Sequence, residues 1–205
     1  MIRLLTCIAV ILGTGTVLRA DDLFPPLWRG DQGSTVQQWN FATDEHIPAP
    51  DSVSNPYGDP LLRVNSVDDW IDGIDQRQGV WSLSGEIDVY IPNWPEIRPE
   101  KEIWVQLTWK ATDVDPFLPN EPVVGVVPFE YMEASLISEQ LGDGWMHSLF
   151  LINIWPNPVE EWITIKGDIM VDQLVIDTIC VPEPATLVLF GMGWLVTVAR
   201  KKRSV

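Results

Sequence analysis

The sequence is poor in the two residue types that most often bind metals or form cross-links: it has two cysteines and two histidines among 205 residues. Cys7 lies in an apolar N-terminal run, so removal of that run leaves Cys180 without a partner for an intramolecular disulfide. His46 and His147 lie far apart, which excludes the short His spacings of helical or hairpin metal sites. We therefore expect a domain that is stabilised by packing alone.

Basic residues are also scarce between the two ends of the chain. Residues 21–184 hold all 29 acidic residues and only seven Lys and Arg, so their net charge is 7 − 29 = −22. Binding to nucleic acid depends on neutralising phosphates with Lys and Arg, which excludes nucleic acid as a partner. The charge favours solubility through repulsion, and some of the carboxylates could bind calcium.

No segment between the two ends has an apolar repeat of helical period over ten or more residues. Apolar and polar residues instead alternate, as in WSLSGEIDVYI (81–91) and KEIWVQLTWK (101–110), which predicts strands with one buried face. Further predicted strands cover 34–41, 60–65, 123–137, 145–155, 161–167 and 172–180, and proline-rich loops cover 47–60, 92–100 and 113–122. This pattern predicts an all-β domain over 21–180, an antiparallel β-sandwich or jelly roll.

The N-terminus carries the first long uncharged run. Arg3 precedes residues 4–18, and Ala20 stands just before the acidic pair Asp21-Asp22. This order is typical of a secretory signal peptide. We expect a signal helix over residues 1–20, cleavage after Ala20, and a mature domain outside the cytoplasm.

A second uncharged run, ATLVLFGMGWLVTVA (185–199), lies near the C-terminus. As a helix it would be about 22 Å long, and a hydrocarbon layer is about 30 Å thick. Long basic side chains can extend toward the headgroups and mark the cytoplasmic end of a span. We therefore expect a short transmembrane helix followed by a basic tail, 200–203, made of Arg200, Lys201, Lys202 and Arg203.

Just before this span stands the sequence Val181-Pro182-Glu183-Pro184-Ala185. The prolines keep such a segment extended, because proline donates no backbone hydrogen bond and disfavours helix in the preceding residue. The motif, span and basic cluster, in this order over 181–205, resemble the sorting signal of PEP-CTERM proteins, found in bacteria that make extracellular polysaccharide. The resemblance implies that an exosortase, a membrane-embedded cysteine transpeptidase, recognises Pro182, Glu183 and Pro184. It implies no activity for the domain in front.

The last part of the domain carries a weaker resemblance. A Trp after Gly at 144–145, the turn Pro156-Asn157-Pro158, a short Ile-rich strand and a final strand with Asp follow one another. This rhythm resembles the last strands of galactose-binding-like and carbohydrate-binding jelly rolls. The resemblance implies a fold more than a ligand.

Catalytic patterns are few in this sequence. His147 precedes Ser148 without a G-x-S-x-G turn, and adjacent strand residues point to opposite faces, which argues against a nucleophilic triad. A glycoside hydrolase needs two carboxyl groups facing each other, about 5 to 9 Å apart. The candidates on predicted strands are Glu86, Glu102, Glu130 and Glu133. Such pairs are expected by chance in an acidic domain, so we expect no enzyme and keep the hydrolase as an alternative.

The segment DDWIDGID (68–75) is the main candidate calcium site. Its spacing fails two ligand positions of an EF-hand, so only a looser loop site remains. The candidate ligands are Asp68, Asp69, Asp72 and Asp75, with Asp113 and Asp115 as a second choice. The alternative is a solvated acidic turn.

Tryptophan is the most unusual feature, with ten of the eleven in residues 28–162. Most are expected in the core. Trp104 and Trp162 differ, because alternation places each on the polar face of its strand. An exposed indole there could stack on a sugar ring, or a loop could cover it.

These observations predict an exported, non-enzymatic protein of the cell surface or extracellular matrix. The predicted partners are an exosortase, the membrane through the C-terminal helix, and extracellular polysaccharide as a ligand in the alternative reading. That alternative is a glycan-binding module that uses Trp104 or Trp162.

Overall fold

The computed structural model describes residues 22–67, 69–96, 98–112, 117–127 and 132–181. These residues form ten strands and one 3-10 helix, η1 (Gly142–Gly144), and the part of the chain that is described contains no α-helix. The strands are β1 (Ser34–Trp39), β2 (Ser52–Ser54), β3 (Leu61–Ser66), β4 (Trp70–Ile74), β5 (Arg77–Pro92), β6 (Glu100–Ala111), β7 (Val123–Val127), β8 (Met132–Gln140), β9 (Met146–Ile154) and β10 (Glu160–Val181).

The strands form one open antiparallel sheet with β10 at its centre. The first part of β10, residues 160–171, pairs with β5, and residues 162–166 also pair with β7. The second part, residues 169–181, pairs with β6 and with β1. A register shift lies between Val171 and Gln173, and such bulges bend a strand. One strand thus belongs to both halves of the sheet.

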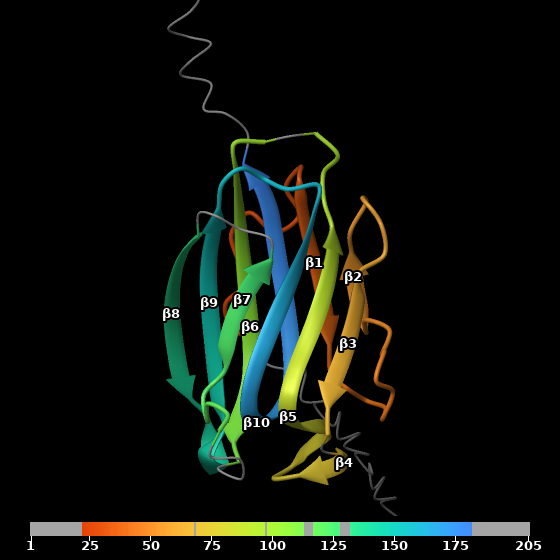
Figure 1. The fold of residues 1–205 in the computed structure, drawn as a ribbon, viewed down its shortest axis with the longest axis vertical. Helices are drawn as coiled ribbons and strands as arrows, with labels where there is room; N and C mark the ends of the chain where they lie inside the picture. The colour runs from red at the N-terminus through yellow and green to blue at the C-terminus, as the bar shows by residue number, and fades with distance from the viewer. Residues whose placement is uncertain (1–21, 68, 97, 113–116, 128–131, 182–205) are drawn as a thin grey trace, which may run out of the picture.

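The sheet folds over at β10 into two layers (Figure 1). The front layer holds β3, β5, β7 and the first part of β10. The back layer holds β1, β6, β8, β9 and the second part of β10. The predicted all-β antiparallel fold is confirmed, but as a single continuous sheet in place of two separate ones. The predicted signal and transmembrane helices lie outside the described residues.

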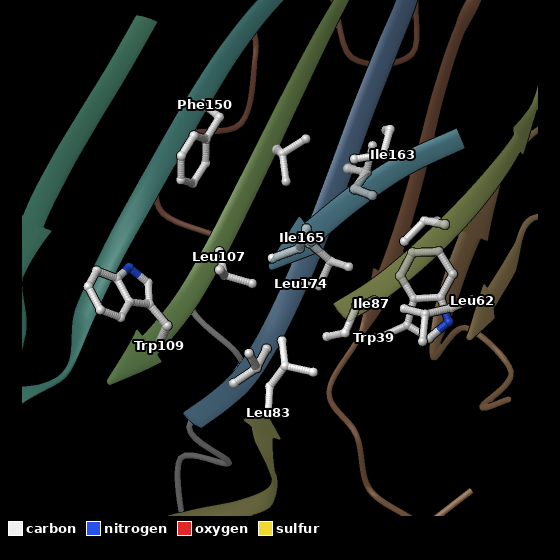
Figure 2. Close-up of a cluster of buried hydrophobic side chains, with 14 of the residues drawn as sticks. Trp39, Leu62, Leu83, Ile87, Leu107, Trp109, Phe150, Ile163, Ile165 and Leu174 are labelled. Atoms are coloured by element: carbon white, nitrogen blue, oxygen red, sulfur yellow. The ribbon is translucent and has the colours of Figure 1, made fainter. Parts of the chain in front are cut away.

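The core lies between the two layers and is apolar. Figure 2 shows Ile163 and Ile165 from the first part of β10 beside Leu107 and Leu174 from the back layer. All four are fully buried. Leu107, Ile163 and Ile165 come from runs in which apolar residues alternate, so the predicted inward faces of these segments are confirmed, whereas Leu174 lies in a continuous apolar run. Burial of such a side chain contributes about 2 kcal/mol, which makes this cluster the main source of stability.

Three strand boundaries differ from the predicted ones. The single strand predicted for 123–137 is two strands, β7 and β8, and the two strands predicted for 161–180 are one, β10. Gly167 suggests a turn in the sequence, yet it pairs with Gly85 within the sheet, and an added Cβ there would lie 3.2 Å from the Pro119 carbonyl oxygen. Glycine is needed at this position for close packing. The short strand β2 lies within the predicted loop 47–60, and β4 lies within the segment 68–75, predicted to be a calcium-binding loop or an acidic turn.

Candidate functional site

The sorting motif begins immediately after the end of β10. Val181, the last residue of this strand, pairs with Glu100 of β6, and Ile179 pairs with Ser34 of β1. The Cys180 amide also donates a hydrogen bond to the Gly33 carbonyl at 3.2 Å. The central strand of the sheet is therefore held by its neighbours up to the residue before Pro182.

The other predicted elements of the two ends lie outside the described residues. These are the signal peptide 1–20, the motif residues Pro182, Glu183 and Pro184, the span 185–199, and the basic residues Arg200, Lys201, Lys202 and Arg203. Among the residues that the structure does describe, no helix is long and apolar enough to cross a membrane.

A buried ion pair lies between the layers near the end of β10. Lys101 Nζ lies 2.6 Å from Glu161 Oε1, and both side chains are fully inaccessible to solvent. Asn93 accepts a hydrogen bond from Lys101 and donates one to Glu161. Burial raises the pKa of the Glu161 carboxyl, and Lys101 and Asn93 oppose this rise. The Asn93 amide therefore bridges two charges that have no contact with water.

Cys180 belongs to the same end of the core. Its Sγ donates a hydrogen bond to Asn157 Oδ1 at 3.4 Å, and the residue is 5% exposed. Burial raises the pKa of this thiol, which keeps it protonated. A protonated, buried thiol is a poor nucleophile, so Cys180 acts as a packing residue of the strand.

The N-terminal segment, residues 22–33, lies against the outer surface of the back layer. Arg29 donates hydrogen bonds to Asp177 of β10 and also to Asp22. Gln106 of β6 donates a hydrogen bond to Asp22 Oδ1 at 2.8 Å and accepts one from the Phe24 amide at 2.9 Å. The segment therefore covers polar side chains that alternation predicts to be exposed, and Gln106 is 1% exposed.

Trp104 lies beneath this segment. Its ring meets Trp28 edge-on, with ring centroids 5.9 Å apart. Both indole nitrogens donate to the same oxygen, Glu102 Oε1. The indole N–H of Trp104 is thus already bonded, and the ring is half-buried.

Trp162 is also half-buried, but it lies on the outer surface of the front layer, where its neighbours are different. Its neighbour across the ladder is Tyr90, with ring centroids 5.3 Å apart. The guanidinium of Arg63 lies 5.6 Å from the centroid of the Trp162 ring. Arg63 is exposed, and Val127, the partner of Trp162 on β7, is 53% exposed. The two predicted tryptophans therefore lie on outer surfaces of different layers.

The acidic segment 68–75 forms mostly regular structure. Asp72 lies within β4, and Asp75 begins the turn from β4 to β5, with φ of 53°. Asp75 accepts a hydrogen bond from Lys110 Nζ at 2.7 Å, which lowers the pKa of its carboxyl. Asp69 is exposed, whereas Asp68 lies outside the described residues. Within the described ranges, no three His, Cys, Asp or Glu side chains gather as metal ligands do.

The two candidate catalytic carboxylates that the structure describes, Glu86 and Glu102, are separated. Glu86 forms an ion pair with Lys166 at 2.9 Å on the outer surface of the front layer. Glu102 lies under the N-terminal segment on the back layer. Glu130 and the Glu133 side chain, like Asp113 and Asp115, lie outside what the structure describes.

Sequence reasoning missed the buried ion pair, although the sequence holds a signal for it. Lys101 has the same strand parity as Ile103 and Val105, and Glu161 has the parity of Ile163 and Ile165. Alternation therefore places both charges on the core side of their strands. Opposite charges at two such positions indicate a buried pair, because neither can be buried alone without a large desolvation cost.

Comparison with known proteins finds one match, at the C-terminus. A family model described as the PEP-CTERM protein-sorting motif matches residues 181–203. No curated protein and no solved structure matches the chain. The chain therefore carries a PEP-CTERM sorting motif, which implies export, processing by an exosortase, and a location at the cell surface or outside the cell.

Proposed function

We propose that the chain is a non-enzymatic protein of the cell surface or extracellular matrix, made as a membrane-anchored precursor and processed by an exosortase. The observation that carries this proposal is the match of residues 181–203 to the PEP-CTERM motif, which begins at Val181, the last residue of β10. The domain is therefore held in place up to the residue before Pro182.

The non-enzymatic part of the proposal is supported by the positions of the reactive groups. Glu86 and Glu102 lie on the outer surfaces of different layers, so they do not face each other across a groove. Cys180 is buried and bonded to Asn157. His147 is buried and hydrogen-bonded to Thr108 and Gln106. Cys180 and His147 thus serve the packing of the domain.

The experiment follows the mass of the protein in strains with and without the exosortase. With the enzyme, we expect a mature form that has lost the residues after the cleavage point near Pro182-Glu183-Pro184. Glu183→Ala should block this step, so that precursor accumulates in the membrane. The matched control is Glu139→Ala, which removes an exposed glutamate of β8 and should leave processing unchanged.

Two results would contradict the proposal. If both strains contain the signal-cleaved protein still ending at Val205, the tail is an ordinary membrane anchor. If Met1 is retained in the envelope fraction, residues 1–20 are not a cleaved signal peptide. Replacement of Arg200, Lys201, Lys202 and Arg203 by Gln should weaken orientation and retention without blocking the cleavage itself.

A second candidate function is glycan binding, because Trp162 and Tyr90 lie together on an outer surface. This candidate is compatible with the first, since a matrix protein can bind the polysaccharide around it.

A further inference from the structure

The outer surface of the front layer carries an apolar row that crosses four strands. Leu61 pairs with Tyr90, Tyr90 with Trp162, and Trp162 with Val127. Strands lie about 4.8 Å apart, so these four residues, the Trp162 row, extend over about 14 Å. This length exceeds that of a contact between two aromatic rings.

The next row on the same surface is polar. Arg63 pairs with Asp88, Asp88 with Thr164, and Thr164 with Gly125. Asn65 also donates a hydrogen bond to Asp88 Oδ2 at 2.8 Å. Guanidinium, carboxylate, hydroxyl and amide groups therefore line one side of the Trp162 row, and these groups bond sugar hydroxyls as donors and acceptors.

Gly125 leaves space beside this polar row. A Cβ at this position would lie 3.1 Å from Thr164 Oγ1, so any larger residue would crowd the hydroxyl. With glycine there, the hydroxyl stays open on the side of β7. The surface is therefore low at Gly125 and higher at Trp162 and Tyr90.

The outer surfaces of the two layers differ in how far other parts of the chain cover them. On the back layer, the N-terminal segment buries Gln106, Thr108 and Asp177 to 1% exposure or less. On the front layer, Arg63 and Asn65 are exposed, and no described strand or loop lies in front of β5 and the first part of β10 in Figure 1. The front surface can therefore receive a ligand without displacement of part of the described chain.

Local charge indicates the class of ligand. Among the exposed or half-buried side chains on the outer surface of the front layer, Arg63 and Lys166 stand against Glu86, Asp88 and Glu160, which gives 2 − 3 = −1. The domain as a whole carries −22 over residues 21–184, so this surface is close to neutral within a strongly acidic protein. A polyanion is repelled by the domain and finds no cationic cluster here.

We propose that the Trp162 row and its polar neighbours bind an uncharged polysaccharide, with pyranose rings stacked on Trp162 and Tyr90. The C–H side of a pyranose ring meets the negative face of an aromatic ring, and the ring hydroxyls reach Arg63, Asp88 and Thr164. The proposal rests on the proposed display of this domain outside the cell, where such polymers occur. Trp104 takes no part, because it lies beneath the N-terminal segment and packs at a steep angle against Trp28.

The test is electrophoresis of the full chain in mild detergent through native gels that contain one polymer each. The probes are hydroxyethylcellulose and galactomannan, which are uncharged, and alginate, which is anionic. We expect retardation by at least one uncharged polymer and none by alginate. Trp162→Ala should weaken the apparent affinity at least tenfold, Trp162→Phe should weaken it less, and Trp104→Ala should leave it unchanged.

Each alternative result overturns the proposal. Absence of retardation by both uncharged polymers, retardation by alginate alone, or equal retardation of Trp162→Ala and the unchanged protein would each do so. A second variant, Arg63→Ala, keeps the test valid if Trp162→Ala fails to fold. Arg63 is exposed, so its loss should weaken retardation while the unfolding midpoint stays unchanged. These gels do not depend on the exosortase, so failure here leaves the processing experiment to decide the proposed function separately.

Discussion

Arg29 donates two hydrogen bonds to Asp177, from Nε to Oδ1 at 2.6 Å and from Nη2 to Oδ2 at 2.7 Å. This paired contact joins the N-terminal segment to β10, four residues before the strand ends at Val181. The Asp177 side chain is fully buried, and burial raises the pKa of its carboxyl to about 6 because desolvation outweighs the favourable contact with Arg29. The first and last described parts of the domain therefore meet at one ionisable group.

The pKa of Asp177 gives a pH dependence with a definite sign. An aspartate in the unfolded chain titrates near pH 4, so between about pH 4 and 6 the folded state holds the additional proton. The contribution of Asp177 to the free energy of unfolding therefore falls as pH rises through this window, by at most about 3 kcal/mol. Urea unfolding of the unchanged protein and Asp177→Asn should show a smaller loss in the variant. Parallel pH profiles would contradict the raised pKa.

Removal of the Arg29 guanidinium from this contact should destabilise the domain. Arg29→Met leaves the buried Asp177 carboxyl without its partner, and we expect the free energy of unfolding at pH 7 to fall by about 2 kcal/mol or more. Arg98→Met is the matched control, because its partner Glu96, 3.4 Å away, is 71% exposed, and such a pair is worth less than about 1 kcal/mol. Equal losses for the two variants, measured by urea unfolding, would show that Arg29 acts only as a surface residue.

The buried pair Lys101–Glu161 predicts strong coupling between two substitutions. Lys101→Met alone leaves an uncompensated buried carboxyl and should cost about 3–5 kcal/mol. The double variant Lys101→Met, Glu161→Leu should recover much of this loss, because burial of two apolar side chains carries no cost of desolvating a charge. A double-mutant cycle measured by urea unfolding checks the coupling. Additive losses would mean that the two charges do not depend on each other.

Gly85 predicts a steric effect in the middle of β5. A Cβ at this position would lie 2.2 Å from the Asn65 carbonyl oxygen, so β3 would have to move away. We expect Gly85→Ala to lower the free energy of unfolding by at least about 2 kcal/mol. In the control Gly142→Ala, the added Cβ meets no atom within 4 Å, and the change should stay below about 0.5 kcal/mol. Similar thermal midpoints for both variants would refute the close approach.

Much of the fold could be predicted from alternation. The strand character and inward face of β5 and β6 follow from Ile87, Val89, Ile103 and Val105, which alternate with polar residues in the sequence and are buried in the structure. The continuity of β10 could not be predicted, because glycine and aspartate at 167–168 are typical of turns. Their positions depend on contacts with Pro119 and Thr112, far away in the sequence.

The surroundings of the candidate tryptophans were only partly predictable. Alternation places Trp104 and Trp162 on outward faces, and both lie there. The difference between them depends on the path of residues 22–33, which have no strand periodicity and contact β6 through single side chains such as Trp28 and Asp22. No local sequence pattern predicts such a path.

The place of β10 in the chain has a consequence for the timing of folding during secretion. This strand is synthesised after the other nine and pairs with β1, β5, β6 and β7. Pairings as distant as Ser34 with Ile179 close slowly, because the loop entropy is lost before the contacts form. When the chain crosses the membrane from its N-terminus, β1, β5, β6 and β7 lack this partner until residues 160–181 follow. The two layers can therefore join only after the last strand before the sorting motif has crossed.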